Sequence, residues 1–186
     1  LNLVIGTFFY RGPKFAEMKL SIYSCNDQKQ WESIVNRLAP THLFYTYGYN
    51  ISFLGHEQGH PYLAHGQSEN GEVIYSFYKR EIQVPKLNDA YFDIITAYGY
   101  GGAIYFPSGD SKLRDLAKAF HVSFSAFCQN EKIVSEFIRF DPKLSNITKI
   151  DSDFYSIRRD NEHYFSKTNF SDDELLGQIK RKQVSG

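Results

Sequence analysis

A chain of 186 residues, 42% hydrophobic and 23% charged, is long enough for one globular domain with a buried core. Its 21 basic and 21 acidic residues cancel, so no long-range field favours DNA or an anionic membrane. No apolar run approaches the roughly 20 residues of a membrane-spanning helix, so we expect no integral membrane segment. Cys25 and Cys128 lack C-x-x-C spacing and are too few for a disulfide framework, which predicts free thiols and a cytoplasmic location.

Residues 1–17 precede Met18, the single methionine of the chain. Their apolar run at 3–10 is followed by a basic residue, whereas a signal peptide places basic residues before its apolar run. We interpret 1–17 as an N-terminal extension. An edge strand or a membrane-touching tail is the alternative.

A strand at 19–23 leads through capping oxygens at 24–27 into an amphipathic helix that ends before Pro40. The buried stripe expected for this helix is Trp31, Ile34, Val35 and Leu38. Thr41 is a candidate cap for a second, aromatic-rich helix running toward residue 54. Two strands, 62–65 and 73–78, flank Asn70-Gly71, which is a strong hairpin signal.

A β-branched and aromatic strand is predicted at 91–96. Asp110 or Ser111 then caps a helix whose expected buried stripe is Leu113, Leu116, Ala117 and Phe120. Further strands are predicted at 132–140, 147–150 and 163–167, and a capping box at 171–174 starts a last helix. Strands and helices in this order predict an α/β fold with a mixed sheet (α+β) covered by helices.

The segment after the 91–96 strand has a composition that ordinary packing does not explain. Gly99, Gly101 and Gly102 imply positive φ angles or a close backbone approach. Tyr98 and Tyr100 between them offer apolar faces with hydroxyls. A tight structural turn and a ligand-lining loop both fit. The aromatic pattern, together with the family resemblance described below, favours the ligand-lining loop.

Glu136 and Arg139 are charged residues in the otherwise apolar strand at 132–140. Three residues apart on a strand, they point to opposite faces and do not pair with each other. Each either finds a structural partner or lies at a cleft beside the glycine loop, where arginine clamps a carboxylate or phosphate. Asp93 is a candidate base, although a lone Asp in a strand is usually structural. No residue is identified as catalytic by sequence chemistry alone.

The segment His56-Glu57-Gln58-Gly59-His60 matches the H-E-x-x-H zinc motif, which requires a helix to bring both histidines to one face. Gly59 weakens a helix, and Pro61 forces His60 away from helical geometry. We therefore predict a surface loop and no metal site, with a metallopeptidase as a distant alternative.

Two segments resemble the FemAB-like branch of the GNAT acyltransferase superfamily. They are 91–102, Tyr-Phe-Asp-Ile-Ile-Thr-Ala-Tyr-Gly-Tyr-Gly-Gly, and 134–142, Val-Ser-Glu-Phe-Ile-Arg-Phe-Asp-Pro. The usual pattern has Pro at Ala97. The resemblance spans about 18–182 and implies a GNAT-like domain at 18–170. It also implies that 171–186 is a helix leading toward a second unit, so that this chain corresponds to a first half.

The resemblance implies an N-acyltransferase or aminoacyltransferase that acts on an amine of a cell-wall or surface-polymer precursor. Acyl-CoA or aminoacyl-tRNA would be the co-substrate, with no permanently bound cofactor. The expected ligand-contacting residues are Tyr98, Gly99, Tyr100, Gly101, Gly102, Glu136 and Arg139. The Q/R-x-x-G-x-G/A loop that usually holds the CoA pyrophosphate is absent from the sequence. A non-catalytic acceptor-binding module, or a truncated remnant without activity, is therefore the alternative.

Overall fold

The computed structural model describes residues 2–5, 18–54, 59–82, 90–141 and 156–159. Its strands form one sheet, in which β5 and β7 are parallel and the other neighbours are antiparallel. The order across the sheet is β2 (Lys19–Ser24), β3 (His60–Ser68), β4 (Gly71–Ile82), β5 (Tyr91–Ile95), β7 (Ile133–Phe137), β1 (Asn2–Ile5) and β8 (Ser156–Arg159). A further strand, β6 (Ile104–Pro107), pairs with the start of β4.

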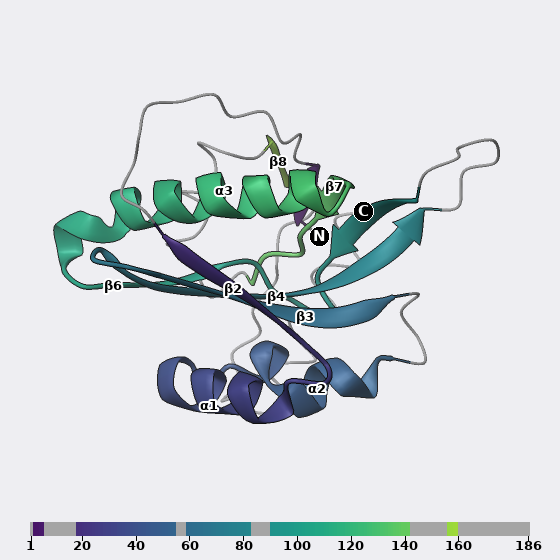
Figure 1. Cartoon of the computed structure of the whole chain (residues 1–186), viewed down its shortest axis with the longest axis horizontal. Coiled ribbons are helices and arrows are strands. Elements are labelled where there is room, and N and C mark those ends of the chain that lie inside the picture. The colour runs from purple at the N-terminus through teal and green to yellow at the C-terminus, as the bar shows by residue number, and fades with distance from the viewer. Residues whose placement is uncertain (1, 6–17, 55–58, 83–89, 142–155, 160–186) are drawn as a thin grey trace, which may run out of the picture.

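Helices cover both faces of the sheet (Figure 1). The long helix α3 (Leu113–Asn130) lies along one face, while α1 (Gln28–Leu38) and α2 (Tyr47–Ser52) lie along the other. This arrangement confirms the predicted α/β fold with a mixed sheet. Within the described parts of the chain, no helix is long and apolar enough to cross a membrane.

Aromatic side chains fill the core beneath α3. The rings of Phe120 and Phe124 stack with centroids 5.4 Å apart, and Phe77 of β4 meets Phe124 edge-on at 5.5 Å. Of the stripe predicted for this helix, Leu116, Ala117 and Phe120 are buried and Leu113 is half-buried. Cys128 is completely buried on the same side, and both cysteines are free thiols, as the sequence predicts.

Helix α1 forms as its spacing predicts. Trp31, Ile34 and Val35 are buried, and the indole Nε1 of Trp31 donates a hydrogen bond of 2.8 Å to the carbonyl of Tyr45. This bond ties α1 to the short 3₁₀ helix η1 (Leu43–Tyr45) that follows it. Phe44, Tyr45 and Tyr47 therefore pack with the buried residues of α1 in one hydrophobic cluster.

The predicted capping residues differ from the observed ones. Asp27 precedes α1, but its carboxylate accepts hydrogen bonds from the backbone and hydroxyl of Ser24 instead of the helix. Thr46, not Thr41, caps α2, because its hydroxyl accepts a bond from the Tyr49 backbone. The 3₁₀ turn η2 (Asp110–Lys112) takes up the residues expected to cap α3, so no side chain caps that helix.

The hairpin prediction is confirmed. Ser68 of β3 pairs with Gly71 of β4, whose φ of 131° favours glycine. Strands β6 and β8 were not predicted. The strands expected at 147–150 and 163–167 and the last helix lie outside the described residues.

Residues 2–5, expected to belong to an extension, form β1 between β7 and β8. A paired strand matches the alternative left open by the sequence, although β1 has neighbours on both sides. The division of the chain at residues 17 and 170 stays a prediction.

An ion-pair cluster fastens α1 to the sheet. Arg37 donates to both carboxylate oxygens of Glu72, at 2.7 and 2.8 Å, and His65 Nε2 lies 2.7 Å from Glu72 Oε2. These contacts, led by the hydrogen bonds from Arg37, lower the pKa of Glu72 to about 2.

We expect Glu72→Gln to lower the free energy of unfolding near neutral pH by about 1 kcal/mol. A depressed carboxylate pKa stabilises the fold above the unfolded-state value near 4.5, and this contribution is lost as the pH falls toward 2. Urea unfolding of both proteins between pH 7 and 2 should therefore show the difference shrinking with acid. Glu32→Gln, at an exposed α1 carboxylate bonded to Gln28, is the control. A difference that stays constant over this range would contradict the assignment.

Candidate functional site

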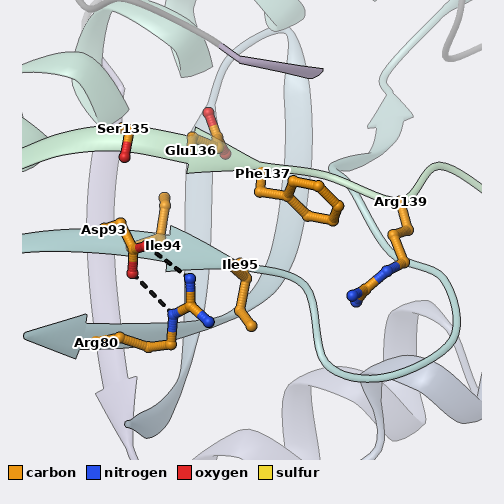
Figure 2. A pocket seen from close by; sticks show the side chains of 8 residues that line it. All are labelled: Arg80, Asp93, Ile94, Ile95, Ser135, Glu136, Phe137 and Arg139. Carbon is orange, nitrogen blue, oxygen red and sulfur yellow. Dashed lines mark hydrogen bonds and ion pairs between the residues drawn. The ribbon is translucent and has the colours of Figure 1, made fainter. Parts of the chain in front are cut away.

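A groove of about 370 Å³ lies over β4, β5 and β7 (Figure 2). Its lining residues are Arg80, Asp93, Ile94, Ile95, Ser135, Glu136, Phe137 and Arg139. Ile95 and Phe137 belong to the hydrophobic cluster that includes Tyr49 of α2, so the groove opens on the sheet face that carries α2. We call it the β5–β7 groove.

Arg80 and Asp93 form a bidentate ion pair within the groove. They face each other in the β4–β5 ladder, with Nε to Oδ1 at 2.8 Å and Nη2 to Oδ2 at 2.6 Å. Sequence reasoning did not identify Arg80, because only the strand register shows that it lies opposite Asp93. The pairing fits the structural interpretation of Asp93.

Arg139 is the second guanidinium of the groove. Its central carbon lies 4.9 Å from the centroid of the Phe137 ring, and Nη1 is 3.4 Å from the carbonyl oxygen of Thr96. None of the carboxylates that the structure describes forms an ion pair with it. The side chain is half-buried and points into the groove (Figure 2). Its positive charge is therefore not neutralised by any carboxylate among these residues.

The backbone of Arg139 is bonded to the glycine loop on both sides. Its N–H donates to Thr96 Oγ1 at 3.1 Å, and its carbonyl accepts from the Gly101 N–H at 2.7 Å. Gly101 also forms a parallel bridge with Phe140. These bonds join the glycine loop (residues 97–102) to the residues that follow β7.

The glycines of this loop have packing reasons of their own. Gly99 has a φ of 98°, and a Cβ there would lie 2.7 Å from Cε1 of Phe44. Gly102 has a φ of 106°, and its Cβ would lie 2.8 Å from Cδ1 of Phe140. A Cβ on Gly101 would lie 2.7 Å from Cγ2 of Thr96. These contacts account for a tight structural turn, and ligand contact by the glycines stays a prediction.

The two tyrosines of the loop differ in exposure. Tyr100 is half-buried and packs edge-on against Phe44, with centroids 5.7 Å apart. Tyr98 is 67% exposed, although its carbonyl accepts a hydrogen bond from the Tyr49 hydroxyl. Tyr98 is therefore the side chain of this loop that is most open to a ligand.

Glu136 and Arg139 point to opposite sides of the sheet, as their spacing predicts. Glu136 is 1% exposed, and Figure 2 shows its carboxylate pointing away from the two guanidinium groups. Burial raises the pKa of the Tyr75 hydroxyl well above its usual range, and the nearby Glu136 carboxylate raises it further. The carboxylate thus lies on the α3 side, beside Tyr75 of the core. This position fits the structural alternative for Glu136.

The H-E-x-x-H segment is only partly described. His60 begins β3 opposite Lys79, so this histidine is extended and not helical. His56 and Glu57 lie outside the described residues. Among the residues that are described, no three His, Cys, Asp or Glu side chains cluster as a metal site would require.

No protein-family model and no curated protein matches the chain. One solved structure is similar, the aminoglycoside N-acetyltransferase AAC(6')-Iy in complex with CoA. The two share 13% sequence identity over 85% of this chain and 99% of the other, with a TM-score of 0.43.

We expect Gly102→Ala to lower the free energy of unfolding by about 1–3 kcal/mol, because it combines a strained φ with a clash against Phe140. Gly48→Ala is the matched control, since a Cβ at this exposed α2 position meets nothing within 4 Å. Alanine there should stabilise the helix by about 0.5–1 kcal/mol. Urea unfolding of both variants and of the unsubstituted chain measures the effects. A Gly102→Ala variant as stable as the unsubstituted chain would show that the loop does not need glycine at 102.

Proposed function

We propose that this chain is the acceptor-binding half of a GNAT-type N-acyltransferase resembling the FemAB-like branch. One observation carries the proposal. The segments 91–102 and 134–142, which bear the resemblance, are about thirty residues apart in the chain yet share one groove. They run parallel as β5 and β7 and meet again at the bridge between Gly101 and Phe140.

The reaction is the direct attack of an acceptor amine on the activated carbonyl of an acyl donor. The carbon–nitrogen bond forms as the donor's carbon–sulfur or carbon–oxygen bond breaks, and the proton lost by the amine ends on the released thiol or tRNA hydroxyl, so no covalent enzyme intermediate is needed. Rate enhancement then comes from positioning and polar stabilisation. In this chain, Arg139 and the exposed Tyr98 bind and orient the acceptor, beside the glycines of the loop. The acceptor class is an amine of a cell-wall or surface-polymer precursor, with acyl-CoA or aminoacyl-tRNA as the donor, in the cytoplasm.

The position of α3 favours an acceptor over a CoA donor in this groove. A pyrophosphate binds well at a helix N-terminus, where backbone N–H groups are free. Helix α3 starts after β6, and Pro107 of β6 pairs with Gly71 at the first residue of β4. Arg80 of the groove lies nine residues further along β4, or about 30 Å at the usual rise of a strand. The same observation favours the second candidate, a non-catalytic acceptor-binding module.

Isothermal titration with a soluble muropeptide precursor tests the proposal. We expect the chain to bind the precursor, and Tyr98→Ala to weaken binding several-fold by removing the exposed aromatic face of the glycine loop, which adjoins β5 without lining the groove itself. Leu43→Ala is the control, because Leu43 is an apolar residue of η1 with a similar exposure of 59% and is not one of the expected ligand contacts.

Thiol release from acetyl-CoA, measured with the precursor present, distinguishes an acceptor-binding chain, which both candidates predict, from a complete enzyme. Release above the uncatalysed rate identifies a complete enzyme. Precursor binding without release identifies an acceptor-binding half or module. Binding of acetyl-CoA but not the precursor would contradict an acceptor role, and binding of neither would contradict both candidates.

A further inference from the structure

We propose that the β5–β7 groove is a carboxylate-recognition site, in which the Arg139 guanidinium holds a single carboxylate of the acceptor molecule. The identity of the ligand as an acceptor rests on the proposed function. Carboxylate recognition itself rests on the groove and is tested without any transfer reaction.

The guanidinium of Arg139 has donors to spare. Its side-chain hydrogen bond to Thr96 is long, at 3.4 Å, and uses one nitrogen. The planar fork of the guanidinium offers further N–H donors, arranged to match the two oxygens of a carboxylate. None of the described carboxylates takes them up in an ion pair. A carboxylate from a ligand would therefore meet unused donors in a half-buried place.

Arg139 is also held in position before a ligand arrives. Its backbone bonds to Thr96 and Gly101 fix the point from which the side chain leaves the chain. The Phe137 ring supports the guanidinium at 4.9 Å and shields part of it from water. Because the side chain is already held in place, less conformational entropy is lost on binding than for a freely moving surface arginine.

The charges of the groove match a monoanion. Arg80 and Asp93 neutralise each other through their bidentate pair, which leaves Arg139 as the uncompensated charge among the described side chains that point into the groove. The Glu136 carboxylate points to the other side (Figure 2). A dianionic phosphate carries one more negative charge than Arg139 neutralises, so a singly charged carboxylate matches the groove better.

The remaining lining residues suit a small organic acid. Ser135 adds a hydroxyl to the groove, and Ile95 and Phe137 add apolar surface for a hydrocarbon group. The volume of about 370 Å³ is at the small end of the range for small-molecule pockets. The ligand class is therefore a compact carboxylic acid, or the carboxylate end of a larger molecule.

Titration of the isotope-labelled chain with N-acetyl-L-alanine, followed by NMR, tests the inference. We expect saturable shifts of the Thr96 and Gly101 amides and at least about tenfold weaker binding of N-acetyl-L-alaninamide, which lacks the charge. Methyl phosphate is the third probe and should bind more weakly than the acid. Equal affinity for the acid and its amide, or tighter binding of methyl phosphate, would overturn the carboxylate assignment.

Variants of the two arginines separate the groove from general charge effects. Arg139→Gln should weaken N-acetyl-L-alanine by about tenfold or more, and Arg139→Lys should retain only part of the affinity because the fork is lost. Arg37→Gln is the matched control, since it removes an exposed guanidinium of α1 that pairs with Glu72. The backbone bonds of Arg139 remain in each variant, and an unchanged amide spectrum elsewhere confirms the fold. An equal loss in Arg37→Gln and Arg139→Gln would refute the site.

The two proposals fail in different ways. Carboxylate binding that depends on Arg139, without precursor binding, would leave the site standing and remove the proposed function. Precursor binding that depends on Tyr98, with no difference between the acid and its amide, would leave the function standing and remove the carboxylate site.

Discussion

The parallel pairing of β5 with β7 is the constraint on which the rest of this site depends. Parallel neighbouring strands require a long crossover connection. Here the crossover from β5 to β7 consists of the glycine loop, β6, η2 and α3. The pairing stops at Ile95 and Phe137 and resumes at Gly101 and Phe140. Between these points the residues from Thr96 to Tyr100 leave the sheet, while Arg139 stays bonded to both ends of the excursion.

The excursion explains why glycine recurs there. The loop must pass close to Phe44, to Thr96 and to Phe140, and it takes positive φ values at Gly99 and Gly102. Side chains at these positions would separate the loop from α2 and from the end of β7. The glycines thus act on the site indirectly. They allow Arg139 to lie beside Thr96, and they leave Tyr98 exposed at the surface.

Alternation along β7 and the extended residues after it distributes charge between the two faces of the sheet. Glu136 faces the aromatic core under α3, and Arg139 faces the groove. Keeping the carboxylate on the far side leaves the arginine without an internal neutralising partner from the same strand. The Arg80–Asp93 pair lies across β4 and β5 and cancels its own charge, so it shapes the groove without adding to its net charge.

Local patterns in the sequence determined the elements whose geometry depends on near neighbours in the chain. Helical spacing placed Trp31, Ile34 and Val35 in the core, Asn70-Gly71 set the hairpin, and a spacing of three put Glu136 and Arg139 on opposite faces. Each of these follows from backbone periodicity or turn geometry, which a short stretch of sequence contains in full.

Contacts between distant segments decided the rest. The Arg80–Asp93 pair depends on the register between β4 and β5. Strand β6 forms because it pairs with β4, some thirty residues earlier in the chain. The Thr46 cap depends on where α2 begins after η1. The sequence shows three glycines in this loop but not that Phe44 and Phe140 pack against them. Periodicity tells which way a side chain points, whereas only the tertiary structure determines what it meets there, because the partner comes from another part of the chain.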